Sequence, residues 1–294
     1  MSVIQNLIDG LGVGATYALL AIGVSMLFGV MHLVNFAHGE LLTVGAYVMY
    51  YLRQREVSWL VVVPAAIAAA VLLSVSIELI AFRRVRQASP FTLLLTSFAV
   101  EILSHSIWRI WLGSKQKPFA APQIAFDTFS IGKLTVEWWD VISIAVAFLA
   151  FGATAWVLKN TLFGVSLRAA AEDFDAARLM GVKANRVISG AFAFAGLLAG
   201  IAGSLYLLRR GSADPRMGAD PLLKAVIAAI IGGLGSLKGA VIGGLALGVV
   251  EVFVRSVLPS GIEGLTDAFV FVAIAILFVV RPQGLFTVTT AERV

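Results

Sequence analysis

A long polar stretch interrupts an otherwise apolar sequence: KNTLFGVSLRAAAEDFDAARLMGVKANR, from Lys159 to Arg186. Its apolar residues recur at three- and four-residue spacing: Leu167, Ala170, Ala171, Phe174, Ala177 and Met180. Residues at this spacing share one helix face, so the sequence predicts a short amphipathic helix over Ser166–Met180. Gly181 follows the last of them, at a position where a helix can end in a left-handed turn.

This predicted helix has two interpretations. In the first, it rests on the surface of a membrane with its apolar face toward the lipid. In the second, it is a docking helix that receives force from a soluble partner. The spacing of the apolar residues is the same in both cases, and the spacing by itself favours the membrane surface.

The composition of the whole chain is that of a membrane protein. Hydrophobic residues make up 60% of the 294 residues, charged residues make up 13%, and the mean hydropathy is +0.94. A soluble domain is nearer a quarter charged. The apolar residues form blocks of about 20, the length that crosses a bilayer as a helix. We therefore expect an all-α, polytopic membrane protein with about eight transmembrane helices, some broken by Gly-rich segments, in one domain over residues 1–294.

Composition and motifs exclude several other classes. The formal charge of +5 at pH 7 points, in a membrane protein, to lipid headgroups and topology before nucleic acid. The chain contains no cysteine, so disulfides and thiolate metal sites are absent. It has no P-loop, no G-x-S-x-G and no metal-hydrolase spacing, so no enzyme is indicated.

A first candidate for a substrate path follows the apolar span Ile4–Val30. Four residues lie close together there, near the expected membrane depth: Asn35, His38, Gly39 and Glu40. Polar side chains are costly in lipid, so these are expected to face protein, water or an interface. Asn35, His38 and Glu40 could cap the ends of broken helices. The alternative for His32 and His38 is a turn at headgroup level, because the stretch offers too few ligands for a metal site.

A second candidate lies closer to the C-terminus. Leu222–Ile231 is too short to span a bilayer, and it leads into a Gly-rich segment. The residues of interest in this segment are Gly232, Gly233, Gly235, Ser236 and Gly239. The pattern predicts a break over 232–240 between two apolar segments, and broken helices at membrane depth often mark a substrate path. The alternative is a tight loop between two tilted helices.

Two groups of charged residues are spaced for ion pairing near the membrane edge. Glu78 lies close to Arg83 and Arg86, which predicts an interfacial pair with snorkelling arginines. Glu251 and Arg255 are four residues apart and share a helix face, which predicts an internal pair. Pairing at the interface is the preferred interpretation for Glu78, ahead of a role in transport.

Four stretches resemble a known family of transport proteins. Residues 175–181, DAARLMG, resemble the EAA loop (E-A-A-x-x-x-G) of bacterial ABC-importer permeases, with Asp in place of Glu and without the usual downstream I-x-L-P. They lie within the longer stretch RAAAEDFDAARLMG at 168–181, and the others are NFAHGELLTVGAY at 35–47, GGLGSLKGAVIGG at 232–244 and RPQGLF at 281–286. In this order they resemble the LivH-type branched-chain amino acid permeases over nearly the whole chain. Lys238 departs from the pattern, because a smaller residue or proline is expected there.

The resemblance implies a permease subunit of an ATP-driven importer that works by alternating access. Its implied substrate is a branched-chain or related hydrophobic amino acid. Urea or a short amide is the alternative, because urea permeases share the motifs. Residues 159–187 would be a cytoplasmic coupling loop that sits in a cleft on the ATPase subunit. The implied coupling residues are Arg168, Glu172, Asp175, Ala176, Ala177, Arg178 and Gly181.

The resemblance also implies partners and a location. The partners are a second, LivM-like permease subunit, two cytoplasmic ATPase subunits and an external solute-binding protein. ATP would bind to the ATPases, and no cofactor is expected on this chain. The location is the bacterial inner membrane, with the N-terminus outside and the C-terminus in the cytoplasm. A self-contained channel or secondary transporter is the alternative from another class, but it leaves the D-A-A-x-x-x-G spacing unexplained.

Overall fold

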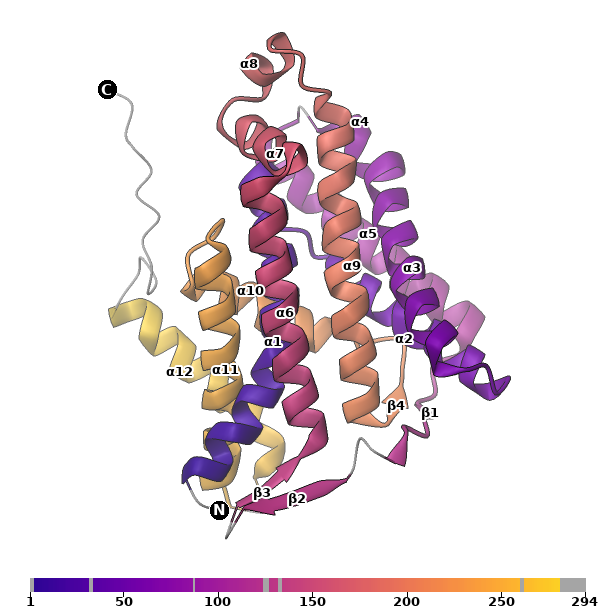
Figure 1. The fold of residues 1–294 in the computed structure, drawn as a ribbon, viewed down its shortest axis with the longest axis vertical. Helices are drawn as coiled ribbons and strands as arrows, with labels where there is room; N and C mark the ends of the chain where they lie inside the picture. The colour runs from indigo at the N-terminus through magenta and orange to yellow at the C-terminus, as the bar shows by residue number, and fades with distance from the viewer. Residues whose placement is uncertain are drawn as a thin grey trace.

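The computed structural model is a bundle of helices, most of which run along one long axis (Figure 1). It describes residues 3–31, 34–86, 88–123, 127–131, 134–259 and 262–280. Within these ranges, six helices are long and apolar enough to cross a membrane. They are α1 (Val3–Met31), α3 (Trp59–Ile77) with its continuation to Val85, α5 (Pro90–Leu112), α6 (Trp138–Asn160), α9 (Ala184–Arg210) and α11 (Leu237–Val257). The predicted class, an α-helical membrane protein, is confirmed.

Three further helices are shorter. They are α2 (His38–Gln54), α10 (Ala219–Ile231) and α12 (Thr266–Val280), with 17, 13 and 15 residues. Adding these three to the six long helices gives nine in the described ranges, so the predicted number of about eight lies between the two counts. The difference arises because hydropathy alone does not tell a partial crossing from a complete one.

The N-terminus and the polar stretch lie at opposite ends of the bundle (Figure 1). At one end, α7 (Leu162–Glu172) and α8 (Phe174–Leu179) connect α6 to α9. At that end, too, α3 passes through a π-helical turn, η1 (Glu78–Phe82), into α4 (Arg83–Val85). This end is called the α8 end below.

Short strands lie at the other end of the bundle. Between α5 and α6, β2 (Thr128–Ile131) and β3 (Leu134–Glu137) form an antiparallel hairpin with Phe129 opposite Val136. Two shorter strands, β1 (Lys117–Pro118) and β4 (Ser212–Ala213), pair antiparallel beside it, and η3 (Glu263–Leu265) precedes α12. β-Branched and aromatic residues favour such strands, but runs of four residues carry little signal in a sequence this apolar.

Helix α1 forms the centre of the packing. It contacts α6, α9, α10 and α11, and its alanines 15, 18 and 21 are completely buried. Glycines let α11 approach it very closely. A Cβ atom at Gly14 would lie 2.8 Å from the backbone oxygen of Gly244, and one at Gly10 would lie 2.6 Å from the Cα of Val249. A Cβ at Gly248 would overlap the backbone of Gly14.

This close contact predicts a large effect from one methyl group. Replacing Gly248 with alanine is expected to separate α1 from α11 and to lower the free energy of unfolding by about 1–3 kcal/mol, because neither backbone can move aside alone. The matched control is Gly152→Ala in α6, where the new Cβ would meet nothing within 4 Å. Denaturant unfolding in detergent micelles measures both variants. Equal stability of the two would contradict the packing argument.

Candidate functional site

The polar stretch folds as two helices, and the prediction of one continuous helix over Ser166–Met180 is wrong. The break lies at Asp173, whose backbone is extended (φ −154°, ψ 107°). The Asp173 side chain accepts a hydrogen bond from the Ala176 N–H at 2.9 Å and so caps the start of α8. Aspartate favours this role over a helix interior, because its short side chain competes for backbone N–H groups.

Helix α7 is attached firmly to the membrane helices. Its first turn is capped by the Thr161 hydroxyl, which accepts from the Gly164 N–H at 3.2 Å. Leu167 and Ala170 are buried, and the Arg168 guanidinium donates a hydrogen bond to the carbonyl oxygen of Leu158 at the end of α6. A displacement of α7 would therefore pull directly on α6.

Helix α8, by contrast, presents apolar side chains to the outside. Leu179 and Met180 are 89% and 86% exposed, while Ala177 is buried against the rest of the chain. Gly181 then turns the chain toward α9 with φ +87°, as the predicted left-handed turn requires. The remaining described coupling residues, Glu172, Ala176 and Arg178, are exposed, and the side chain of Asp175 lies outside the described part of the structure. Helix α8 lies beyond the ends of the long helices (Figure 1).

The first broken element lies between α1 and α2, and its polar side chains are buried. Asn35 accepts a hydrogen bond from the Ala37 N–H at 3.0 Å, just before α2, as expected of a capping residue. Glu40 caps no helix; it accepts from the indole N–H of Trp108, in α5, at 2.6 Å. His38 packs against Gly23 of α1, and neither of its ring nitrogens has a hydrogen-bond partner among the described residues. His32 lies outside those residues.

The second broken element is a sharp turn between α10 and α11. Gly233 and Gly235 have positive φ angles of +86° and +88°, which side chains other than glycine rarely adopt. Ser236 caps α11 by accepting from the Gly239 N–H at 3.1 Å. Since α11 begins at Leu237, the break covers 232–236 and is shorter than the predicted 232–240. Gly39, which belongs to the first broken element, packs against Gly218, which lies just before α10 and so outside this turn.

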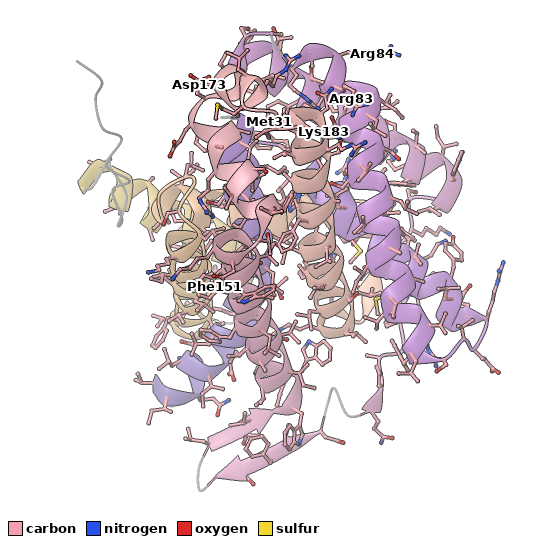
Figure 2. The ribbon with its side chains drawn as sticks, turned by 45° about the horizontal axis from the view of Figure 1, so that its top comes forward. Met31, Arg83, Arg84, Phe151, Asp173 and Lys183 are labelled. Atoms are coloured by element: carbon pink, nitrogen blue, oxygen red, sulfur yellow. The ribbon has the colours of Figure 1, made fainter. Side chains whose placement is uncertain are left out.

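One cavity joins the second broken element to the polar stretch. The N–H of Gly235 donates to the Ser25 hydroxyl of α1 at 3.0 Å, which holds the turn beside α1. The cavity next to this contact has a volume of about 540 Å³. Its mainly apolar wall comes from α1, α6, α7 and the turn, and it includes Met26, Phe151, Leu167 and Leu237. Figure 2 labels Phe151 on α6. We call this space the α7 cavity.

Three basic residues also line the α7 cavity: Lys159, Arg168 and Lys238. Of the predicted site residues, Arg168 and Gly235 meet at this cavity, whereas Asn35, His38 and Glu40 do not line it. The departure from the family pattern at Lys238 therefore places an additional cation beside the break. RPQGLF at 281–286 lies outside the described residues.

The sequence interpretation missed an ionic cluster whose Lys224 and Glu251 side chains are buried and whose Asp267 side chain is partly exposed. The Lys224 ammonium, in α10, lies 3.0 Å from Glu251 of α11 and 2.8 Å from Asp267 of α12. The Tyr17 hydroxyl of α1 donates to Glu251 at 2.8 Å. The predicted Glu251–Arg255 pair exists but is longer, at 3.4 Å. The sequence did contain one indication of this cluster: Lys224 is a single charged residue inside a short apolar segment, and a charge at membrane depth needs a partner.

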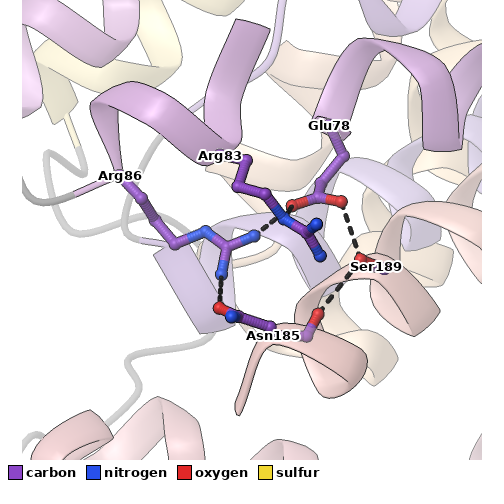
Figure 3. Close-up of polar contacts among 5 residues, drawn as sticks. All are labelled: Glu78, Arg83, Arg86, Asn185 and Ser189. Atoms are coloured by element: carbon purple, nitrogen blue, oxygen red, sulfur yellow. Dashed lines mark hydrogen bonds and ion pairs between the residues drawn. The ribbon is translucent and has the colours of Figure 1, made fainter. Parts of the chain in front are cut away.

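The predicted ion pair at Glu78 forms, with Arg86, but the predicted exposure of this pair at the interface is wrong. The Glu78 side chain is completely buried, so it is an internal anchor and not a surface partner. It accepts from the Arg86 guanidinium and, at 2.7 Å, from the Ser189 hydroxyl of α9 (Figure 3). Arg83 is more distant, at 3.7 Å. These contacts fix the π-helical turn to the start of α9.

Comparisons with known proteins agree with the motifs. The model of the protein family described as "Branched-chain amino acid transport system / permease component" matches residues 6–281. The high-affinity branched-chain amino acid transport system permease protein BraD of Pseudomonas aeruginosa is 32% identical over 99% of this chain and 98% of its own length. The permease protein LivH of Escherichia coli K12 is 30% identical over 99% and 97%. A solved structure of a metal-chelate-type ABC transporter, inward-facing, has a TM-score of 0.49 at 15% identity and covers 94% of this chain and 84% of that one.

Proposed function

This chain belongs to the family of branched-chain amino acid transport system permease components, and on that basis we propose that it forms part of the translocation path of an ATP-driven importer. It is a transport subunit with several membrane helices. The proposed substrate is a branched-chain or related hydrophobic amino acid, because the relatives that match nearly its whole length are described as permeases for branched-chain amino acids. ATP hydrolysis is assigned to separate partner chains.

The observation that carries the mechanism is the connection from α8 to the α7 cavity. Helix α8 offers Leu179 and Met180 to a partner, and an ATPase cleft would bury them. Helix α7 follows α6 directly and contributes Leu167 and Arg168 to the cavity wall. When the ATPases close, α8 moves and α7 moves with it, so the cavity opens to one side of the membrane and then to the other.

The α7 cavity has the size and lining for the proposed substrate. Ligand pockets typically measure about 300–1,000 Å³ and are mostly apolar with a few polar groups. Here a space of about 540 Å³ is lined mainly by apolar side chains, with three cations that can meet a carboxylate.

The proposed assembly follows from the two ends of the bundle. Two cytoplasmic ATPases bind the α8 end of this chain and of a second, LivM-like permease, which sets residues 159–187 in the cytoplasm. The N-terminus and the β2–β3 hairpin, at the opposite end in Figure 1, then face the outside, where a solute-binding protein delivers substrate. The C-terminus is assigned to the cytoplasm of a bacterium, and the membrane is its inner membrane.

The test is a pull-down of the full chain from its native membrane in mild detergent, followed by uptake assays. We expect ATPase chains and a second permease in the purified complex, and ATP-dependent uptake of leucine in proteoliposomes that contain the binding protein. Uptake of urea but not of leucine would show that the proposed substrate class is wrong and that the chain is still part of an ATP-driven importer. Activity of the chain alone, without ATP, would contradict the proposal and make it a channel or secondary transporter.

A further inference from the structure

We propose that the α8 end of the bundle contains a binding site for a phosphate-bearing anion, between α4, α8 and the start of α9. The site does not depend on the transport substrate. Its basic residues are Arg83, Arg84, Arg86, Arg178, Lys183 and Arg186. Figure 2 labels Arg83, Arg84, Lys183 and Met31 at this end of the bundle. We call this group the arginine site.

Two adjoining cavities form the arginine site. The first, of about 360 Å³, has an apolar floor of Val30, Met31 and Ile188 and is walled by Arg83, Arg84, Arg86 and Arg178. The second, of about 380 Å³, is lined by Lys183 and Arg186. Arg178 and Asn185 line both cavities. The space is therefore large enough for a phosphate group with its substituent, and guanidinium groups approach it from two helices.

The charge of the arginine site is not balanced by the part of the protein that the structure describes. No carboxylate lines either cavity there. The nearby Glu78 is buried and already accepts from Arg86 and Ser189 (Figure 3). Within the described residues, Arg84, Arg178, Lys183 and Arg186 form no ion pair. Like charges held together in this way repel one another, so an anion between them is strongly favoured.

Arg86 points to a missing acceptor more directly. Its side chain is 10% exposed, and its terminal nitrogens bond Glu78 and the Asn185 side chain, the latter at 2.8 Å. The buried Nε of the same guanidinium has no hydrogen-bond partner among the described residues. Leaving a buried charged donor without an acceptor is costly. Arg86 lines the first cavity, and because its Nε is buried, an anion there reaches the Nε only when the Arg86 side chain shifts.

The start of α9 adds a further attraction. This helix has 27 residues, and its N-cap, Lys183, makes no side-chain capping bond. The positive end of the helix dipole favours an anion there. The oxygens of one phosphate can accept hydrogen bonds from an arginine guanidinium and from backbone N–H groups at the same time, and a phosphate carries up to two negative charges.

Occupancy of this site has a structural consequence. An anion that contacts Arg83 or Arg84 together with Arg178 bridges α4 to α8, so it sets how firmly α8 is held against the bundle. Two sources have this chemistry. One is the headgroup of an anionic phospholipid, since the site lies where membrane helices end; the other is a soluble phosphate.

The experiment compares the transporter, purified with the full chain, in two kinds of nanodisc. In the first arm, phosphatidylcholine nanodiscs are titrated with inorganic phosphate. In the second, phosphatidylglycerol is added to the nanodiscs and the phospholipid retained per complex is counted by mass spectrometry. Thermal unfolding and hydrogen exchange of residues 174–186 are read in both arms. Binding in the first arm identifies a soluble source, and binding in the second identifies a lipid.

The variant Arg84→Gln/Arg178→Gln removes two exposed guanidinium groups without touching the buried Arg86–Glu78 contact. It is expected to weaken binding at least about tenfold, because two charge-assisted contacts are lost. The control Arg55→Gln/Lys115→Gln removes two exposed cations elsewhere and is expected to bind as the wild type does. The proposal is wrong if neither anion binds, or if both variants bind equally. Cross-linking of this site to an acidic segment of an ATPase, with no anion bound, would also overturn it. Because binding is read without uptake, this result is independent of the proposed function.

Discussion

Replacing Lys224 with methionine is expected to lower the free energy of unfolding by about 3–5 kcal/mol, the cost of leaving a buried charge without its partner. Lys224 lies within 3.0 Å of both Glu251 and Asp267, and these residues come from α10, α11 and α12. Methionine has a similar length and keeps the apolar stem. It removes only the positive charge, so the buried Glu251 carboxylate loses the ammonium beside it, whereas Asp267, which is 55% exposed, keeps its contact with solvent.

The position of Lys224 explains why the effect should be large. Helix α10 is short, and the turn that follows it folds back into α11, so the packing of α10 depends on its side-chain contacts. Tyr17 extends the cluster to α1, where its hydroxyl donates to Glu251. The loss of one charge therefore weakens the attachment of α10 to three other helices at once.

Denaturant unfolding in micelles measures this effect, and the same helical hairpin provides a control. Lys238→Met makes an identical substitution at an exposed lysine after the turn and is expected to change stability little. The double variant Lys224→Met/Glu251→Gln removes both charges and is expected to recover part of the loss, because a neutral pair costs less to bury. If Lys224→Met is as stable as Lys238→Met, the ionic cluster does not hold α10.

Replacing Gly181 with valine is expected to reduce transport at least about tenfold while ATP hydrolysis continues. Gly181 has φ +87°, and a β-branched residue is strained there by roughly 1–2 kcal/mol or more. A Cβ at this position would meet nothing within 4 Å, so the change acts through the backbone and not through packing. The strain changes the direction in which the chain leaves α8, and α8 then transmits less of the ATPase movement to α7.

Uptake and ATP hydrolysis in proteoliposomes give the two measurements, and Gly113→Val is the matched control. Gly113 also has a positive φ, +80°, and open space around its Cβ, but it ends α5, just before β1 at the opposite end of the bundle. Asp175→Lys reverses a charge on the same helix, and it is also expected to reduce transport while ATP hydrolysis continues. Normal transport by Gly181→Val would remove α8 from the mechanism, and equal losses in both glycine variants would indicate a general effect of strain.

Features that depend on near neighbours could be read from the sequence. Blocks of apolar residues predicted membrane helices, because a helix crosses a bilayer in about 20 residues whatever surrounds it. Gly181 and the Gly233–Gly235 turn could be predicted for the same reason, since positive φ is a property of one residue and its peptide bonds. The break at Asp173 could also have been predicted, because aspartate often caps a helix. The three- and four-residue spacing of apolar residues continued across it, however, and indicated one helix.

Contacts between distant segments required the tertiary structure. Lys224 and Tyr17 are 207 residues apart, and nothing in the sequence around either of them indicates that they meet. The burial of Glu78 depends on where α9 packs, and the α7 cavity exists only because α1, α6, α7 and the turn before α11 converge. Hydropathy and local spacing determine that this chain enters a membrane as helices, and its glycines mark the turns at Gly181 and Gly233–Gly235. Which charges pair, and which broken ends share a cavity, depend on helix packing, because these pairs form only when separate helices come into contact.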